Sequence, residues 1–185
     1  MKNKNFQTQY LIERKNLFMD RKVRVVQFGT GKMAVYTMRY VFEKGGEVVG
    51  AIDVNPKVIG EDIGTVMGRE ETGVKVTRLE DAENLLKELK PDIAIVTTMS
   101  LIKDVEEALM LCAKLGINAI TTCEEAFFPA NSNPTITKAL DEMAKQTGCT
   151  ITGRYQKTYA DAGRGDCFSE WIRGRPARKT SSHVL

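Results

Sequence analysis

The sequence has only one histidine, and it lacks the cysteine patterns typical of metal or disulfide sites. His183 is the third residue from the end of the 185-residue chain, so we expect it to be idle rather than catalytic. The four cysteines form no CxxC pair and no evenly spaced framework. We therefore expect reduced thiols in a cytoplasmic protein, and no metal site.

Long apolar runs and a strong net charge are also missing. No apolar run approaches the ~20 residues that a membrane span requires, and the first 20 residues have no uninterrupted apolar core typical of a secretory signal. The formal net charge of +3 is too small to indicate nucleic-acid binding. No segment repeats at a fixed period. The composition, 42% hydrophobic and 28% charged, is ordinary for a globular domain.

Strands and helices alternate through most of the chain. Residues 1–20 are predicted to be a polar N-terminal extension, and residues 154–185 an irregular basic tail. Between them, apolar runs predict strands, and periodic segments predict helices. Strands are expected at 22–28, 47–53, 74–76, 92–98, 117–123 and 149–153, and helices at 32–46, 79–90, 101–115 and 133–148, the last with Asn133 as N-cap. This order predicts an α/β fold with a doubly wound, mostly parallel sheet, that is, a Rossmann-type NAD(P)-binding domain over 21–153.

A glycine-rich segment joins the first predicted strand to the first predicted helix. In "VVQFGTGKMA", Gly29 permits a tight turn, Gly31 leaves the backbone open to a pyrophosphate, and Ala34 lets the helix pack close to the sheet. The helix N-terminus supplies unpaired N–H groups and a partial positive charge. The alternative is that the glycines merely shape a turn.

Asp53 ends the second predicted strand, 24 residues after Gly29. A carboxylate there accepts hydrogen bonds from the adenosine ribose and repels a 2′-phosphate, which favours NAD over NADP. Lys57 can swing toward a 2′-phosphate, so NADP stays open as a cofactor. The alternative for Asp53 is that it only caps a strand.

The loops after the fourth and fifth predicted strands should flank the nicotinamide. Thr97 and Thr98 can contact the cofactor there without adding charge, and Glu124 and Glu125 can hold a substrate ammonium or take its proton. The alternative is a pair of solvated loop acids. The expected cofactor contacts are Gly29, Thr30, Gly31, Lys32, Met33, Asp53, Thr97 and Thr98, and the expected catalytic residues are Glu124 and Glu125.

With these segments in view, residues 21–153 resemble the 2,4-diaminopentanoate dehydrogenase family of amine dehydrogenases, which is related to dihydrodipicolinate reductase. The specific segments are "NAITTCEEAFFP" and "NPTITKALDEMAKQTGCTITG". The resemblance implies NAD(P)-dependent oxidative deamination of 2,4-diaminopentanoate to 2-amino-4-oxopentanoate in ornithine breakdown. It also implies an amine or amino-acid substrate, homodimeric full-length relatives, and the Glu124–Glu125 pair near the substrate amine.

Two other functions remain open from the sequence: a NAD(P)-binding module without turnover, and an imine reductase similar to dihydrodipicolinate reductase. The family pattern continues after Gly153 into a second, substrate-binding domain, whereas this chain continues as a basic, glycine-dotted segment. We expect that segment to be the product of a frameshift or premature stop; a nucleic-acid arm is the alternative.

Overall fold

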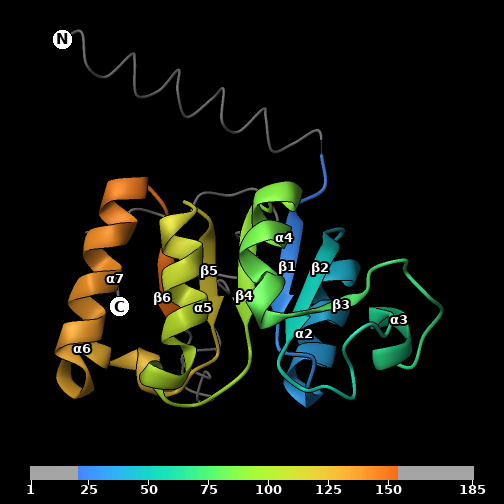
Figure 1. Ribbon diagram of the computed structural model, residues 1–185, viewed down its shortest axis with the longest axis horizontal. Helices are drawn as coiled ribbons and strands as arrows, with labels where there is room; N and C mark the ends of the chain where they lie inside the picture. The colour runs from blue at the N-terminus through green and yellow to red at the C-terminus, as the bar shows by residue number, and fades with distance from the viewer. Residues whose placement is uncertain (1–20, 154–185) are drawn as a thin grey trace, which may run out of the picture.

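Six parallel strands form one sheet in a computed structural model that describes residues 21–153 (Figure 1). The predicted polar extension and basic tail lie outside the described residues. The spatial order of the strands is β3-β2-β1-β4-β5-β6, which is the Rossmann order. The strands are β1 (Arg24–Phe28), β2 (Glu47–Asp53), β3 (Val76–Arg78), β4 (Ile93–Val96), β5 (Asn118–Thr121) and β6 (Ile151–Gly153). The predicted doubly wound parallel sheet is confirmed.

Helices cover both faces of this sheet. One face carries α2 (Lys32–Glu43) and the short α3 (Ile63–Val66), while α4 (Ala82–Leu89), α5 (Ile102–Lys114) and α7 (Pro134–Thr147) lie on the opposite face (Figure 1). Three single-turn elements complete the described fold: η1 (Leu79–Asp81), η2 (Glu125–Phe127) and α6 (Pro129–Ser132). Each crossover connection returns the chain to start a strand in the same direction, as a parallel sheet requires.

The core forms two layers because successive strand residues point to opposite faces. Val25 and Ile95 pack with Met38 of α2, whereas Val26 and Val96 pack in the cluster of α4, α5 and α7. The central strands are therefore apolar on both faces. This explains the uninterrupted apolar run that β4 shows in the sequence.

All six strands end at the same edge of the sheet, here called the carboxyl edge; the opposite edge is the amino edge. The first helix after β1 lies on one face, and the helices after β4 and β5 lie on the other. The loops after β1 and β4 consequently diverge at the carboxyl edge, and ligands of open α/β sheets bind in the crevice formed there.

Most of the expected strands and helices are a few residues shorter in the structure, and the segment 79–90 begins with the 3-10 turn η1. Two further expectations differ for reasons that the contacts explain. The third strand is Val76–Arg78 rather than 74–76, because Val74 and Lys75 pair with the loop 61–63: the Ile63 N–H donates to the Val74 carbonyl at 2.9 Å, and an isolated bridge joins Asp62 to Lys75. Asn133 occupies the N-cap position of α7 but makes no side-chain cap bond. Its amide instead donates to Glu125 Oε1 at 2.8 Å.

Candidate functional site

Gly29 makes the tight turn that follows β1. Its φ is +84°, a left-handed conformation that residues with a Cβ rarely adopt. A Cβ at this position would lie 3.1 Å from the Thr97 carbonyl oxygen and 3.0 Å from Thr98 Cγ2. The turn and the close approach of the loop after β4 thus both require glycine, which confirms the predicted role of Gly29 in the turn.

Gly31 differs from Gly29 because nothing in the described protein requires glycine there. Its φ of −69° and ψ of −172° suit any residue, and no atom lies within 4 Å of a Cβ built on it. Gly31 is the N-cap of α2, with no side-chain cap bond and no acidic residue in the first turn. The first N–H groups of α2 therefore have no side-chain partner from the cap or the first turn, and the space beside Gly31 is open to an anion such as a diphosphate.

Asp53, at the end of β2, lies against the glycine loop. Its Oδ2 accepts hydrogen bonds from the Thr30 N–H and hydroxyl, each at 2.6 Å, and its Oδ1 accepts from the Asn55 N–H at 2.9 Å. Burial favours the neutral acid, but these hydrogen bonds outweigh it and hold the pKa of Asp53 below its usual value. Asp53 is thus a carboxylate that ties β2 to the glycine loop, and its role toward a ribose stays a prediction.

The hydroxyl of Thr97 is engaged by the protein. It accepts from Gln27 Nε2 at 2.8 Å and donates to the Phe28 carbonyl at 3.2 Å. Gln27 is completely buried, and its Oε1 accepts from Thr37 of α2 at 2.9 Å. The hydrogen of the Thr97 hydroxyl is therefore committed, whereas Thr98 is exposed beside Gly29. Gln27 was missed from the sequence, where its one signal is an amide within a valine-rich strand.

Glu125 connects three elements on the β5 side of the carboxyl edge. Its Oε2 accepts from the Ile102 N–H at 2.7 Å and caps α5, which has no cap of its own, and its Oε1 accepts from Asn133. The Glu125 N–H and the Cys123 thiol both donate to the Ser100 carbonyl, at 3.1 and 2.9 Å. The hydrogen bond from Ile102, above all, lowers the pKa of Glu125.

Glu124 has different surroundings from its neighbour. Its side chain is exposed, and a hydrogen bond from the Ser100 side chain lowers its pKa. Among the described residues it caps no helix and makes no ion pair. The structure brings both predicted acids to the loop after β5, but it leaves only Glu124 with a carboxylate directed at neither a helix terminus nor an asparagine.

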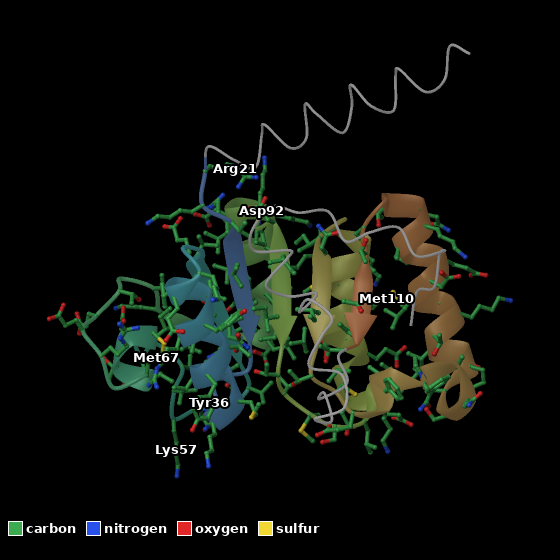
Figure 2. All side chains as sticks on the ribbon, turned by 180° about the vertical axis from the view of Figure 1, so that it is seen from behind. Arg21, Tyr36, Lys57, Met67, Asp92 and Met110 are labelled. Atoms are coloured by element: carbon green, nitrogen blue, oxygen red, sulfur yellow. The ribbon has the colours of Figure 1, made fainter. Side chains whose placement is uncertain are left out.

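Exposed large apolar side chains gather at the carboxyl edge. Every such side chain in residues 21–153 lies in a loop after a strand or in the first turns of the helix that follows. They are Met33, Tyr36, Val54, Met99, Leu101, Phe127 and Phe128. Figure 2 shows Tyr36 at this edge, opposite Arg21 and Asp92 at the amino edge. Apolar exposure concentrated beside convergent polar groups is typical of a ligand site.

The strand order and the helices on both faces define a Rossmann-type domain, in which α2 begins without a side-chain cap. Comparison with known proteins supports the predicted resemblance. The chain is similar to 2,4-diaminopentanoate dehydrogenase of Acetoanaerobium sticklandii, with 28% identity over 137 residues, which cover 71% of this chain and 37% of that protein. No family model matches the chain.

Solved structures show the same similarity. The amine dehydrogenase from Mycobacterium smegmatis has 36% sequence identity and a TM-score of 0.68, over 72% of this chain and 39% of that one. Dipicolinate-bound dihydrodipicolinate reductase from Paenisporosarcina sp. TG-14 has 18% identity and a TM-score of 0.50, over 71% of this chain and 47% of that one, which is a likeness of fold alone. The chain thus spans about two fifths of the dehydrogenases that it matches.

Two further searches concern only residues 21–153. No group of three or more histidine, cysteine, aspartate or glutamate side chains in that range is arranged to hold a metal ion. None of the helices in that range is both long and apolar enough to cross a membrane.

Proposed function

We propose that this chain is the dinucleotide-binding part of an NAD(P)-dependent dehydrogenase that acts on a CH–NH2 group. The observation that carries the proposal is Gly31: nothing among the described residues needs glycine there, and Gly31 is the N-cap of a helix that has no side-chain cap bond. A diphosphate is the ligand that needs both features. The similarity to two amine-oxidising dehydrogenases supports the reaction class.

In this proposal the backbone from Gly31 to Met33 holds the diphosphate, because the Thr30 N–H already donates to Asp53. Asp53 binds the adenosine ribose. The nicotinamide lies over the loop that contains Thr97 and Thr98. Because the Thr97 hydroxyl is engaged by Gln27 and Phe28, Thr98 and the backbone are the better candidates for contact. The bound cofactor supplies the acceptor for a hydride from the amine-bearing carbon of the substrate.

We assign the acid–base role to Glu124. Its exposed carboxylate can pair with a substrate ammonium and take one proton as the hydride leaves, after which water adds to the iminium carbon and ammonia departs. Glu125 is committed to the N-terminus of α5 and to Asn133, so its role is to hold the loop that carries Glu124. The substrate that the relatives favour is 2,4-diaminopentanoate, with 2-amino-4-oxopentanoate as the product.

A binding module without turnover is the second candidate, and one observation favours it. The chain spans 37% and 39% of its two relatives, so more than half of each relative has no counterpart in the match. We expect the 185-residue chain by itself to bind cofactor and to oxidise the diamine weakly or not at all.

Calorimetry and absorbance measurements separate these outcomes. The folded chain is titrated with NAD and NADP, and NADH absorbance is then followed after adding 2,4-diaminopentanoate. Heat of binding without NADH formation supports the binding module, and NADH formation supports the dehydrogenase. In an active chain, Glu124→Gln should abolish most turnover, whereas Glu125→Gln, which can still accept from the Ile102 N–H, should retain more. No heat with either coenzyme would exclude both candidates.

A further inference from the structure

Asp53 has a basic residue as its strand partner on β3. Ala51, Ile52 and Asp53 of β2 pair in parallel with Val76, Thr77 and Arg78 of β3. Asp53 and Arg78 are therefore direct partners at the carboxyl edge, on neighbouring strands about 4.8 Å apart. This pairing could not be derived from the sequence, which placed the third strand at 74–76.

The two partners also point to the same face of the sheet. Ala51 and Val76 are buried in one core cluster, together with Met38 of α2. Because side chains alternate along a strand, Asp53 and Arg78, two positions further on, lie on that same face. It is the face on which α2 begins and on which Thr30 donates to Asp53. Arg78 therefore stands at the ribose end of the site proposed above.

Arg78 has the properties of a group available to a ligand. Its side chain is exposed and makes no ion pair or hydrogen bond within residues 21–153, although Arg78 is the strand partner of Asp53. Asp53 Oδ2 is instead used by the two Thr30 donors. Lys57, the other basic residue near this end, extends outward at the carboxyl edge in Figure 2, while its backbone N–H is held by Asn55 Oδ1 at 3.1 Å.

We propose that Arg78 binds the 2′-phosphate of NADP, so that this chain accepts NADP as well as NAD; the inference rests on the proposed cofactor site. A guanidinium offers a planar pair of N–H donors that matches two phosphate oxygens. The positive charge of Arg78 also offsets the negative charge of Asp53, which would otherwise repel the phosphate. The unphosphorylated ribose of NAD needs only the remaining acceptor capacity of Asp53.

The test compares 2′,5′-ADP with 5′-ADP, and NADP with NAD, by calorimetry on the folded 185-residue chain. The only difference within each pair is the 2′-phosphate. We expect Arg78→Ala to weaken NADP and 2′,5′-ADP about tenfold or more, as expected for a lost charge-assisted phosphate contact. Binding of NAD and 5′-ADP should change by less than about threefold. The affinity of Arg78→Lys for the phosphorylated ligands should lie between those of the wild type and Arg78→Ala. Lysine keeps the positive charge but loses the planar pair of N–H donors.

Arg39→Ala is the matched control. It removes the same charge from an exposed position in α2, roughly 10 Å along the helix from its start. It should leave all four affinities nearly unchanged, which separates a local contact from an effect of net charge. Thermal unfolding checks that each variant is folded.

The possible results are distinguishable. Selective loss of the phosphorylated ligands in Arg78→Ala supports the inference. If NAD binds but NADP does not, or if Arg78→Ala weakens both coenzymes equally, the inference is wrong and the proposed cofactor site stands. If neither coenzyme binds to the folded wild-type chain, the cofactor site and the inference both fail.

Discussion

The two edges of the sheet differ in how completely their polar groups are paired. At the amino edge, Arg21 donates two hydrogen bonds to Asp92, at 2.7 and 2.6 Å. The Arg24 N–H donates to the same carboxylate at 2.8 Å, and Asn118 donates to the Asp92 carbonyl at 3.0 Å. Figure 2 shows Arg21 and Asp92 together at this edge. At the amino edge, Asp92 thus connects the residues at the start of β1 with those at the starts of β4 and β5.

At the carboxyl edge, by contrast, α2 begins without a cap and the exposed large apolar side chains of the described residues gather. Arg78 also lies there without an ion partner inside the described residues. Exposed apolar surface together with an uncapped helix N-terminus at one edge of a domain is typical of a ligand site. We therefore expect substitutions at the amino edge to change stability and substitutions at the carboxyl edge to change cofactor binding. Three substitutions test this difference between the two edges.

Gly31→Ser should have the largest effect, and it should act on binding alone. Serine is a good N-cap residue, and apart from its immediate chain neighbours no atom of the described residues lies within 4 Å of the new Cβ. The side chain would occupy the space proposed for the diphosphate. We expect NAD affinity to fall about 100-fold, or about 2.7 kcal/mol, in calorimetry, with an unfolding free energy equal to or above that of the wild type. Wild-type affinity in this variant would show that the open space beside α2 is not the cofactor site.

Gly29→Ala should instead destabilise the fold. The left-handed conformation costs a residue with a Cβ about 1–2 kcal/mol, and here the Cβ would also contact the Thr97 carbonyl. Gly60→Ala is the matched control: its φ is also +84°, but nothing lies within 4 Å of the added Cβ. Denaturant unfolding should show a larger loss for Gly29→Ala, and the difference measures the contact with the loop after β4. Equal losses of unfolding free energy in the two variants would mean that the loop after β4 moves away from the added Cβ at no cost.

Asp92→Asn should have the smallest effect, confined to stability. The amide keeps one acceptor for Arg21 or Arg24 but loses the charge, which we expect to cost about 1 kcal/mol of unfolding free energy. Cofactor affinity should be unchanged, because Asp92 lies at the amino edge. A substantial loss of NAD binding in a folded Asp92→Asn chain would contradict the separation of the two edges.

The different roles of the two acids after β5 could not be predicted from the sequence. Glu124 and Glu125 are adjacent in a loop, and adjacency gives no indication of where either side chain points. Their difference arises because Glu125 meets the N–H of Ile102, 23 residues earlier in the chain, and the amide of Asn133. Likewise, the sequence does not indicate that the Thr97 hydroxyl, a predicted cofactor contact, accepts a hydrogen bond from Gln27 of β1. Long-range hydrogen bonds of this kind depend on which strands are neighbours.

The order of strands and helices, the parallel sheet, the turn at Gly29 and the position of Asp53 at the end of β2 were determined by the sequence alone. Each depends on local properties: apolar periodicity, a glycine that tolerates a positive φ, and short spacing along the chain. Only the tertiary structure decided which of Glu124 and Glu125 caps a helix and that the Thr97 hydroxyl is hydrogen-bonded to Gln27. It also decided that Arg78 is the strand partner of Asp53. These follow from strand order and register, which bring together residues that lie far apart in the chain.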